Sequence, residues 1–460
     1  MDLFTEQIRG TILHSESGNG VKGAAEGKEH QVIRAGEQER ALTEELMSII
    51  CSQSNLARAY KRVKSNKGCA GIDQVGVDEF LEWYIPNEAE LIKSLIAGTY
   101  QPSAVKGVEI DKPDGGKRLL GIPTVKDRFI QQAIYQALSP LYEREFSESS
   151  YGFREKRNAH QALAKSKEYV KEGRKIVVDI DLEKFFDRVN HDRLMYKLSL
   201  KIKDKVLLKL IRKYLQSGMM QGGLVSQRIE GTPQGSPLSP LLSNIVLDEL
   251  DKELEKRGHK FCRYADDCNI YVRSEKAGGR VMQSISSFIE SVLKLKVNSQ
   301  KSKVGNSYEC KFLGHIIFFD GELGVSPQNL QRLKEKIRRI TKRNKGKSFE
   351  TIVKELNSML PGWLNYFRFA KMRKHVIRLD EWIRHKLRCY RLKQCKRTYA
   401  IKRFLSKLGI WDWHSWLVAL SGKGWWRLSA TPQAQQAMNL QWFEEQGLFN
   451  LTFNYTKLNH

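Results

Sequence analysis

The segment KFCRYADDCNIYV places two adjacent carboxylates, Asp266 and Asp267, inside an apolar run that favours a β-strand. This feature limits what the chain can fold into more than any other. Carboxylates beside an apolar sheet repel each other and are costly to desolvate, unless a hard cation such as Mg²⁺ neutralises them. We expect the Tyr-Ala-Asp-Asp tetrad at a hairpin tip, where neighbouring side chains diverge. The segment therefore predicts a metal-binding turn.

A two-metal site needs a further carboxylate from another element, and the β-branched segment IVVDIDLEKFFD supplies one. Asp179 and Asp181 face the same side of a strand, because side chains alternate with a period of two. Spacing does not choose between them, although Asp181 is weakly favoured because it lies closer to the strand end. Glu183 and Asp187 are weaker candidates, because the chain turns into the aromatic residues there.

The segments around these two predict a mixed domain. LTEELMSIICSQSNLARAYKRV and KDRFIQQAIYQALSPLYEREF have helical periodicity, and VEIDKPDGGKRLLGIP has the pattern of two short strands around the turn Asp114-Gly115-Gly116. Strands that alternate with helices are typical of an α/β or α+β catalytic domain. Residues 1–40 are rich in Gly, Ser, Glu and Gln and predict a mobile arm.

The charge of the chain indicates a polyanionic partner. Its 460 residues contain 78 Lys and Arg against 52 Asp and Glu, a formal net charge of +26. Nucleic acid is the first candidate, because neutralising phosphates drives its binding, and an anionic membrane surface is the competing one. The sequence has no apolar run of about 18 residues, and its N-terminus has no signal-peptide pattern. We expect a cytoplasmic, soluble protein with no membrane partner.

Most of the excess charge lies in one segment. Residues 328–400 hold 22 Lys and Arg against 5 Asp and Glu, with apolar residues at helical spacing. A charged run is usually a solvated face, but an excess this large favours a helical module that binds nucleic acid. Arg384 and Arg388 are candidate contacts. The last 60 residues are aromatic and predict a small packed domain.

The ordered motifs resemble those of a group II intron-encoded reverse transcriptase/maturase of the bacterial type. They are YADD (264–267), DIDLEKFFD (179–187), TPQGSPLSP (232–240) and GWLNYF (362–367), with KPDGGKRLLGIPTVKDRFIQQAI and SYGFR upstream. The chain lacks the paired cysteines and the His/Asn cluster of the HNH endonuclease domain that some relatives carry. The resemblance implies an α+β right-hand polymerase, with fingers and a palm built on an antiparallel sheet, followed by an α-helical thumb/maturase domain.

The resemblance also divides the chain. It implies a mobile arm at residues 1–40, fingers and palm at 41–325, a basic helical thumb/maturase domain at 326–400, and a small aromatic-rich nucleic-acid-binding domain at 401–460.

The resemblance chooses between the two candidate aspartates. In the family the first metal-binding aspartate precedes a bulky aromatic residue by five positions, which fits Asp181 with Phe186. Asp181, Asp266 and Asp267 would then hold two Mg²⁺ ions, assisted by the Leu182 carbonyl. Phe186 would stand where a ribose 2′-hydroxyl would clash and would select dNTPs.

Other positions match residues that contact the nucleotide or the nucleic acid in the family. Lys112 and Arg118 correspond to the cations that grip the triphosphate. Gln234 corresponds to the residue at the nascent pair, and Gly235 would permit close backbone approach. Lys301 resembles the general acid for pyrophosphate, and Lys303 is close enough to compete for that role.

The implied function is RNA-directed DNA synthesis by two-Mg²⁺ nucleotidyl transfer. The protein would copy intron RNA during mobility from a DNA or RNA primer at target DNA, and would bind structured intron RNA to assist its splicing. One alternative is a reverse transcriptase domesticated for phage defence or DNA repair. The other is a maturase-only RNA-binding splicing factor. The chain departs from the family at Ser236 and Glu155, where Gly and Pro are usual, and these departures leave template or nucleotide preference open without removing a metal ligand.

Overall fold

The computed structural model describes residues 44–459 except 112–114, 222–223, 227–228 and 345. The predicted arm at 1–40 and the candidate Lys112 lie outside the described residues. The first described elements are α3 (Leu46–Ile50), α4 (Gln53–Ser65) and α5 (Phe80–Ile96). The sequence predicted one helix through α3 and α4. The chain instead breaks at Ser52, which is extended at the N-cap of α4 and donates its hydroxyl to the Ile49 carbonyl.

The fingers contain a four-stranded sheet. Its strands are β1 (Val105–Asp111), β2 (Lys117–Ile122), β4 (Met219–Gln221) and β5 (Leu224–Ser226), in the order β2-β1-β4-β5. The predicted hairpin is the antiparallel β1–β2 pair, and the predicted helix after it is α6 (Val125–Glu143). The short strand β4 adds to β1 in parallel and brings the region before the Pro-Gln-Gly turn beside the fingers.

The palm contains a second four-stranded sheet, and all its pairs are antiparallel. The strands are β6 (Lys260–Tyr264), β7 (Asp267–Val272), β3 (Ile176–Ile180) and β8 (Lys303–Asn306), in the order β6-β7-β3-β8. Both carboxylate-bearing segments are thus neighbouring strands. Between β2 and β4 the chain also forms α7 (Ala159–Lys171), α8 (Phe185–Arg188), α9 (His191–Lys201) and α10 (Lys205–Gln216).

Each face of the palm sheet is covered by helices. Ile270 belongs to one buried cluster together with residues of α11 (Ser239–Lys256) and α12 (Glu275–Ser291). Its neighbour Tyr271 points to the opposite face and belongs to a second cluster that includes α7. The alternation follows from the period of two along a strand. It leaves the carboxylates at the end of the sheet near the β6–β7 turn.

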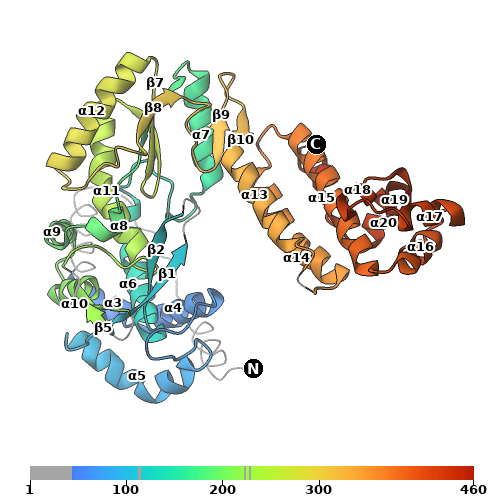
Figure 1. Cartoon of the computed structure of the whole chain (residues 1–460). Helices are drawn as coiled ribbons and strands as arrows, with labels where there is room; N and C mark the ends of the chain where they lie inside the picture. The colour runs from blue at the N-terminus through green and yellow to red at the C-terminus, as the bar shows by residue number, and fades with distance from the viewer. Residues whose placement is uncertain (1–43, 112–114, 222–223, 227–228, 345, 460) are drawn as a thin grey trace, which may run out of the picture.

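The second cluster continues far beyond the palm. It runs through β9 (His315–Ile317) and β10 (Leu323–Val325) into helices that extend away from the sheets (Figure 1). These are α13 (Pro327–Ile340), α14 (Phe349–Phe367), α15 (Arg373–Cys395), α16 (Thr398–Lys407), α17 (Asp412–Ala419), α18 (Trp425–Leu428), α19 (Pro432–Ala437), α20 (Leu440–Glu445) and α21 (Leu451–Asn459). The predicted helical module is therefore confirmed, and the α+β prediction for the whole chain with it.

The helices after residue 400 share this core with α13 to α15. Asp380 of α15 is buried and accepts the backbone N–H groups of Leu451 and Thr452 at 3.0 and 2.7 Å. This carboxylate satisfies the first turn of α21, which would otherwise leave donors unpaired. Within the residues that the structure describes, we find no helix with the length and apolar character needed to span a bilayer.

Candidate active site

The Tyr-Ala-Asp-Asp tetrad forms the tip of the β6–β7 hairpin, as the sequence predicts. Tyr264 pairs with Asp267, and Ala265 and Asp266 form a two-residue turn between them. Ala265 has a φ of +59°, a left-handed conformation that is unfavourable for a residue with a side chain. Such a conformation persists only where its surroundings determine it. The turn therefore depends on the contacts beneath it.

A buried arginine supplies those contacts. Arg263 is fully buried, and its guanidinium donates to both carboxylate oxygens of Asp251 at 2.7 and 2.5 Å. Its remaining nitrogen donates to the Asn244 side chain at 3.0 Å and to the Ala265 carbonyl at 2.9 Å. Arginine suits this place because its planar fork binds a carboxylate with two parallel bonds. The Arg263–Asp251 pair thus fixes the backbone of the turn from below.

The segment SYGFR lies directly against the same turn. Tyr151 donates its N–H to the Arg263 carbonyl at 2.9 Å, and Asn244 donates to the Gly152 carbonyl at 2.9 Å. A Cβ on Gly152 would lie 2.2 Å from the Ala265 nitrogen. Position 152 therefore requires glycine. The sequence singled out this motif by resemblance alone, without a role for it.

The second carboxylate segment lies beside the hairpin. Asp179 pairs with Asn269 of β7 and with Lys303 of β8. Asp181 follows the end of β3, and its backbone is held on both sides: its N–H donates to the Ser302 hydroxyl at 3.0 Å, and its carbonyl accepts from the Asn298 N–H at 2.8 Å. The structure thus brings Asp181 to the end of the sheet that carries the hairpin turn.

Burial and mutual repulsion raise the pKa values of Asp179, Asp266 and Asp267. Burial is the first cause for each. It raises the pKa of Asp179 to about 6, with Asp181 adding to the shift. The pKa of Asp266 is raised by burial and by the charge of Asp181, and that of Asp267 is raised well above its usual range by burial and then by Asp179, Asp266 and Asp181. The charge of Asp181 therefore acts on all three of these carboxylates.

This donor set has the chemistry that a hard cation requires, since carboxylate oxygens are the preferred ligands of Mg²⁺ and a cation would relieve their repulsion. In the described part of the chain, however, no three acidic, histidine or cysteine side chains converge tightly enough to hold a metal ion. The match between this site and a Mg²⁺ ion therefore rests on the electrostatic coupling of the carboxylates and on their oxygen ligands.

Three more candidates lie on the strands and turns around Asp181. Leu182 is buried and forms a bridge with Val297. Lys301 is exposed in the turn between Asn298 and Ser302, the two residues that hold the Asp181 backbone. Lys303, the competing candidate, donates its ammonium to the Glu309 carbonyl at 2.8 Å, and its charge lowers the otherwise raised pKa of Asp179. Lys303 therefore has partners within the fold.

The fingers approach the same carboxylates. Arg118 of β2 is exposed, and its charge lowers the otherwise raised pKa of Asp266. The Gln234 carbonyl accepts the Gly121 N–H at 2.8 Å. Gly235 has a φ of +114°, and a Cβ there would lie 2.8 Å from the Gly121 carbonyl oxygen. The glycine in the Pro-Gln-Gly turn is thus required by close packing on β2.

Phe186 and Gln234 line one large cavity of about 1,160 Å³ together with Gly235. The neighbouring Phe185 is buried in the core. Phe186 is partly exposed at the cavity wall. Sequence reasoning missed four cations in the same cavity: Arg58, Lys61, Arg62 and Arg128. The first three recur at helical spacing on α4, which is the signal that could have identified them.

The two arginine candidates of α15 have different surroundings. Arg388 donates to the Met438 carbonyl at 3.2 Å and stacks over the Phe443 ring at 5.8 Å. Burial lowers the pKa of Arg388 to about 10, and the charge of Arg384 adds to this shift. Arg388 therefore packs between α15 and the last helices, and Arg384 lies beside it, half-buried.

Comparison with known proteins adds to this geometry. The family described as "Reverse transcriptase (RNA-dependent DNA polymerase)" matches residues 110–317, and the family described as "Group II intron, maturase-specific domain" matches residues 330–409. Protein YkfC of Escherichia coli (strain K12) is 31% identical over 313 residues, which cover 59% of this chain and 82% of that protein. The chain belongs to the group II intron-type reverse transcriptase/maturases. Its palm carboxylates lie in the polymerase domain, and α13 to α15 lie in the maturase-specific domain.

Two further similarities are more limited. The group II intron-encoded protein LtrA of Lactococcus lactis subsp. cremoris is 39% identical over 149 residues, 32% of this chain, and the match covers only 24% of LtrA. A structure of the partial Cas6-RT-Cas1–Cas2 complex is 26% identical over 54% of this chain and 43% of that one, with a TM-score of 0.35. The two family descriptions and the match to LtrA support an intron-type reverse transcriptase/maturase, and neither alternative function is better supported.

Proposed function

We propose that this reverse transcriptase/maturase copies intron RNA into DNA during intron mobility, with a DNA or RNA primer and target DNA as partners. We also propose that it binds structured intron RNA and assists its splicing. The observation that carries the polymerase role is the hairpin turn. In this turn the charge of Asp181 acts on both Asp266 and Asp267, and the charge of Arg118 acts on Asp266.

The proposed site assigns a role to each candidate residue. Asp181, Asp266 and Asp267, with the Leu182 carbonyl, would hold two Mg²⁺ ions, which supply charge neutralisation at the triphosphate and a more acidic primer 3′-hydroxyl. Arg118, with Lys112, offsets the charge of the triphosphate. Gln234 and Phe186 position the incoming sugar at the cavity wall. Lys301 supplies a proton to the departing pyrophosphate.

The cationic cavity supports a path for the template. Arg58, Lys61 and Arg62 of α4 line the same cavity as Phe186 and Gln234. Cations beside a cavity of this size suit a sugar-phosphate backbone. We therefore propose that the unpaired template strand lies along α4 before it reaches the site.

The maturase role rests on the helices after β10. A protein that binds the folded intron RNA stabilises that fold by mass action, while the RNA performs the splicing chemistry. We propose that α13 to α15 hold the template–primer duplex and dock on intron RNA, and that the helices after residue 400 contact nucleic acid. Support comes from the excess of 17 positive charges in residues 328–400 and from exposed aromatic residues such as Trp411 and Trp413 in the last helices.

Primer extension on an RNA template with Mg²⁺ and dNTPs tests the polymerase site. We expect Asp266→Ala to reduce cDNA synthesis at least about 1,000-fold, because the turn loses a carboxylate that would bind metal, and to change RNA affinity by no more than a few fold. Asp187→Ala is the matched control, because Asp187 belongs to the second acidic motif and is exposed.

Unchanged synthesis by Asp266→Ala would refute the assignment of the site. If the natural chain bound RNA but synthesised no DNA, the maturase-only function would replace the polymerase proposal.

A further inference from the structure

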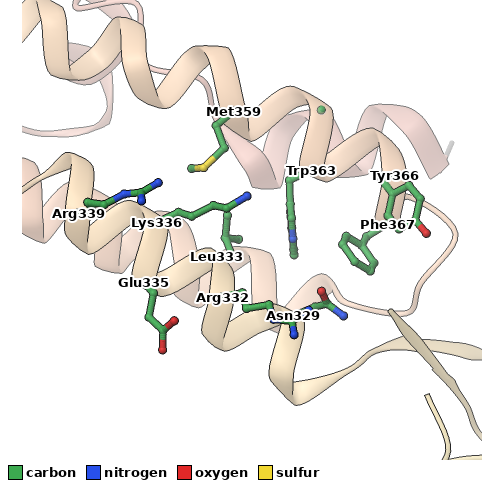
Figure 2. A pocket seen from close by; sticks show the side chains of 11 residues that line it. Asn329, Arg332, Leu333, Glu335, Lys336, Arg339, Met359, Trp363, Tyr366 and Phe367 are labelled. Carbon is green, nitrogen blue, oxygen red and sulfur yellow. The ribbon is translucent and has the colours of Figure 1, made fainter. Parts of the chain in front are cut away.

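A groove between α13 and α14 has a composition that the active site does not explain (Figure 2). Its volume is about 690 Å³, which is within the range of pockets that bind small molecules. It begins beside the loop before β9, where Tyr366 donates its hydroxyl to the Leu313 carbonyl at 2.9 Å and Asn329 donates to the Gly314 carbonyl at 3.2 Å. We call this space the thumb groove.

One wall of the thumb groove is cationic. Arg332, Lys336 and Arg339 lie on one face of α13, at intervals of four and three residues. In the part of the chain that the structure describes, none of the three forms an ion pair. The acidic Glu335 also borders the groove, but its side chain points away from Trp363 (Figure 2) and accepts a hydrogen bond from Gln331 at 2.8 Å.

The other wall is apolar and aromatic. Met359 and Trp363 lie one turn apart on α14, and the Trp363 ring packs against Phe367 with centroids 5.1 Å apart. Trp363 is only partly buried, and its indole stands between the two helices opposite the cations (Figure 2). A flat apolar ring opposite several unpaired cations matches the two halves of a nucleotide, a base and a phosphate.

We propose that the thumb groove binds an unpaired nucleotide of an RNA strand, with its base stacked on Trp363 and its phosphates on Arg332, Lys336 and Arg339. A base inside a duplex is already stacked on its neighbours, so the nucleotide must come from a bulge or a single strand. This inference rests on the proposed function only in that the partner is nucleic acid. It adds the recognition of one base to the attraction between phosphates and the basic helices.

Charge complementarity favours a nucleotide over a protein segment. A protein helix seated here would have to supply acidic side chains opposite all three cations and an apolar residue opposite Trp363. A nucleotide carries both features in every unit of its chain. A protein occupant, including a second copy of this chain, is therefore an outcome of the test.

The test uses the full chain and a 12-nucleotide single-stranded RNA that carries one 2-aminopurine, a fluorescent base whose emission reports stacking. The same strand in a fully paired duplex serves as the second probe. We expect Trp363→Ala to weaken single-strand binding by about 5- to 150-fold and to remove the fluorescence change. Binding of the duplex should stay within about threefold, and Trp363→Phe should retain most of the single-strand affinity because it keeps an aromatic face.

A matched pair of lysines controls for overall charge. Lys336→Ala should weaken single-strand binding, whereas Lys334→Ala removes the same charge from the opposite side of α13, where Lys334 borders a second groove, and should weaken it less. Trp382→Ala is the aromatic control, since Arg338 and Lys386 already lie over its ring at 5.5 and 5.1 Å.

Three results would overturn the inference. They are unchanged single-strand binding by Trp363→Ala, equal losses for the single strand and the duplex, and a change in self-association without a change in RNA binding. Primer extension at saturating substrate separates the two proposals. Suppose that the natural chain binds the single strand but extends no primer, and that Trp363→Ala binds the single strand more weakly. The proposed polymerase function then fails, and the groove assignment stands.

Discussion

At the scale of single residues, the buried pair of Arg263 and Asp251 links the interior of the palm to the Tyr-Ala-Asp-Asp turn. Removing one partner of a buried ion pair leaves an uncompensated charge, which costs about 3–5 kcal/mol. Here it would also release the Ala265 carbonyl, to which Arg263 donates. We therefore propose Arg263 as a positioning residue for Asp266.

We predict that Arg263→Lys lowers kcat about 10- to 100-fold and raises the Mg²⁺ concentration needed for half-maximal rate, because a lysine cannot bond Asp251, Asn244 and Ala265 together. Binding of Mn²⁺, followed by electron paramagnetic resonance, should weaken in parallel. Arg257→Lys is the control, since Arg257 pairs with Glu253 at 2.7 Å on the same helix end but at the surface. A fall in stability with unchanged metal dependence would reduce Arg263 to a purely structural role.

His315 gives a prediction for pH. Burial lowers the pKa of His315 to about 4 from its ordinary value near 6.5. The unfolded chain therefore binds a proton that the folded chain excludes between those values, so stability is lost as the pH falls from about 6.5 towards 4. Replacing His315 with Gln should flatten this loss by up to about 3 kcal/mol. The free energy of unfolding in urea should be measured at pH 7 and pH 4.5 for the natural chain and for His315→Gln. Equal losses of stability in the two proteins would contradict the lowered pKa of His315.

Much of the site could be predicted at this scale, and the rest could not for a physical reason. Asp266 and Asp267 are apparent because two charges interrupt an apolar strand. Arg263 is not, because an arginine in a strand usually faces solvent, and only the fold brings Asp251 of α11 to it. Spacing alone also left Asp179 and Asp181 open, and the structure shows that both charges act on Asp267.

At the scale of elements, the hairpin and the SYGFR segment behave as one unit. We predict that Gly152→Ala reduces primer extension about 100-fold or more, because the new Cβ would lie 2.2 Å from the Ala265 nitrogen and displace the turn. Gly279→Ala in α12 is the control, where a Cβ meets nothing within 4 Å and should add about 0.5–1 kcal/mol of stability. Full activity of Gly152→Ala would show that the turn tolerates displacement.

Elements with a strong local pattern were predicted correctly, such as α6 and the β6–β7 hairpin. The break between α3 and α4 was not, because Cys51 and Ser52 interrupt the helix without a proline or glycine to mark the place. The parallel pairing of β1 with β4 was also not predicted. It joins strands more than 100 residues apart, and short strands carry little sequence signal of their own.

At the scale of the whole molecule, the palm carboxylates and the basic helices occupy different parts of the chain. We predict that Asp266→Ala leaves the rate of protein-assisted intron splicing within about twofold, because the change hardly alters a net charge of +26, while it abolishes cDNA synthesis. Splicing of a precursor RNA and primer extension should be measured on the same preparation. A parallel loss of both activities would show that the palm itself takes part in holding the intron.

The apolar cluster that starts on one face of the palm sheet and ends at Leu451 of α21 has a consequence for anyone who wishes to shorten this polymerase. A cut near residue 400 would not release a spare module. It would strip α21 from Asp380 and uncover a surface that continues inward to Tyr271, which lies four residue pairs along the β6–β7 ladder from the Tyr264–Asp267 pair at the turn. A minimal enzyme would therefore need a redesigned surface on α14 and α15, and simple trimming from this end would produce an aggregating protein.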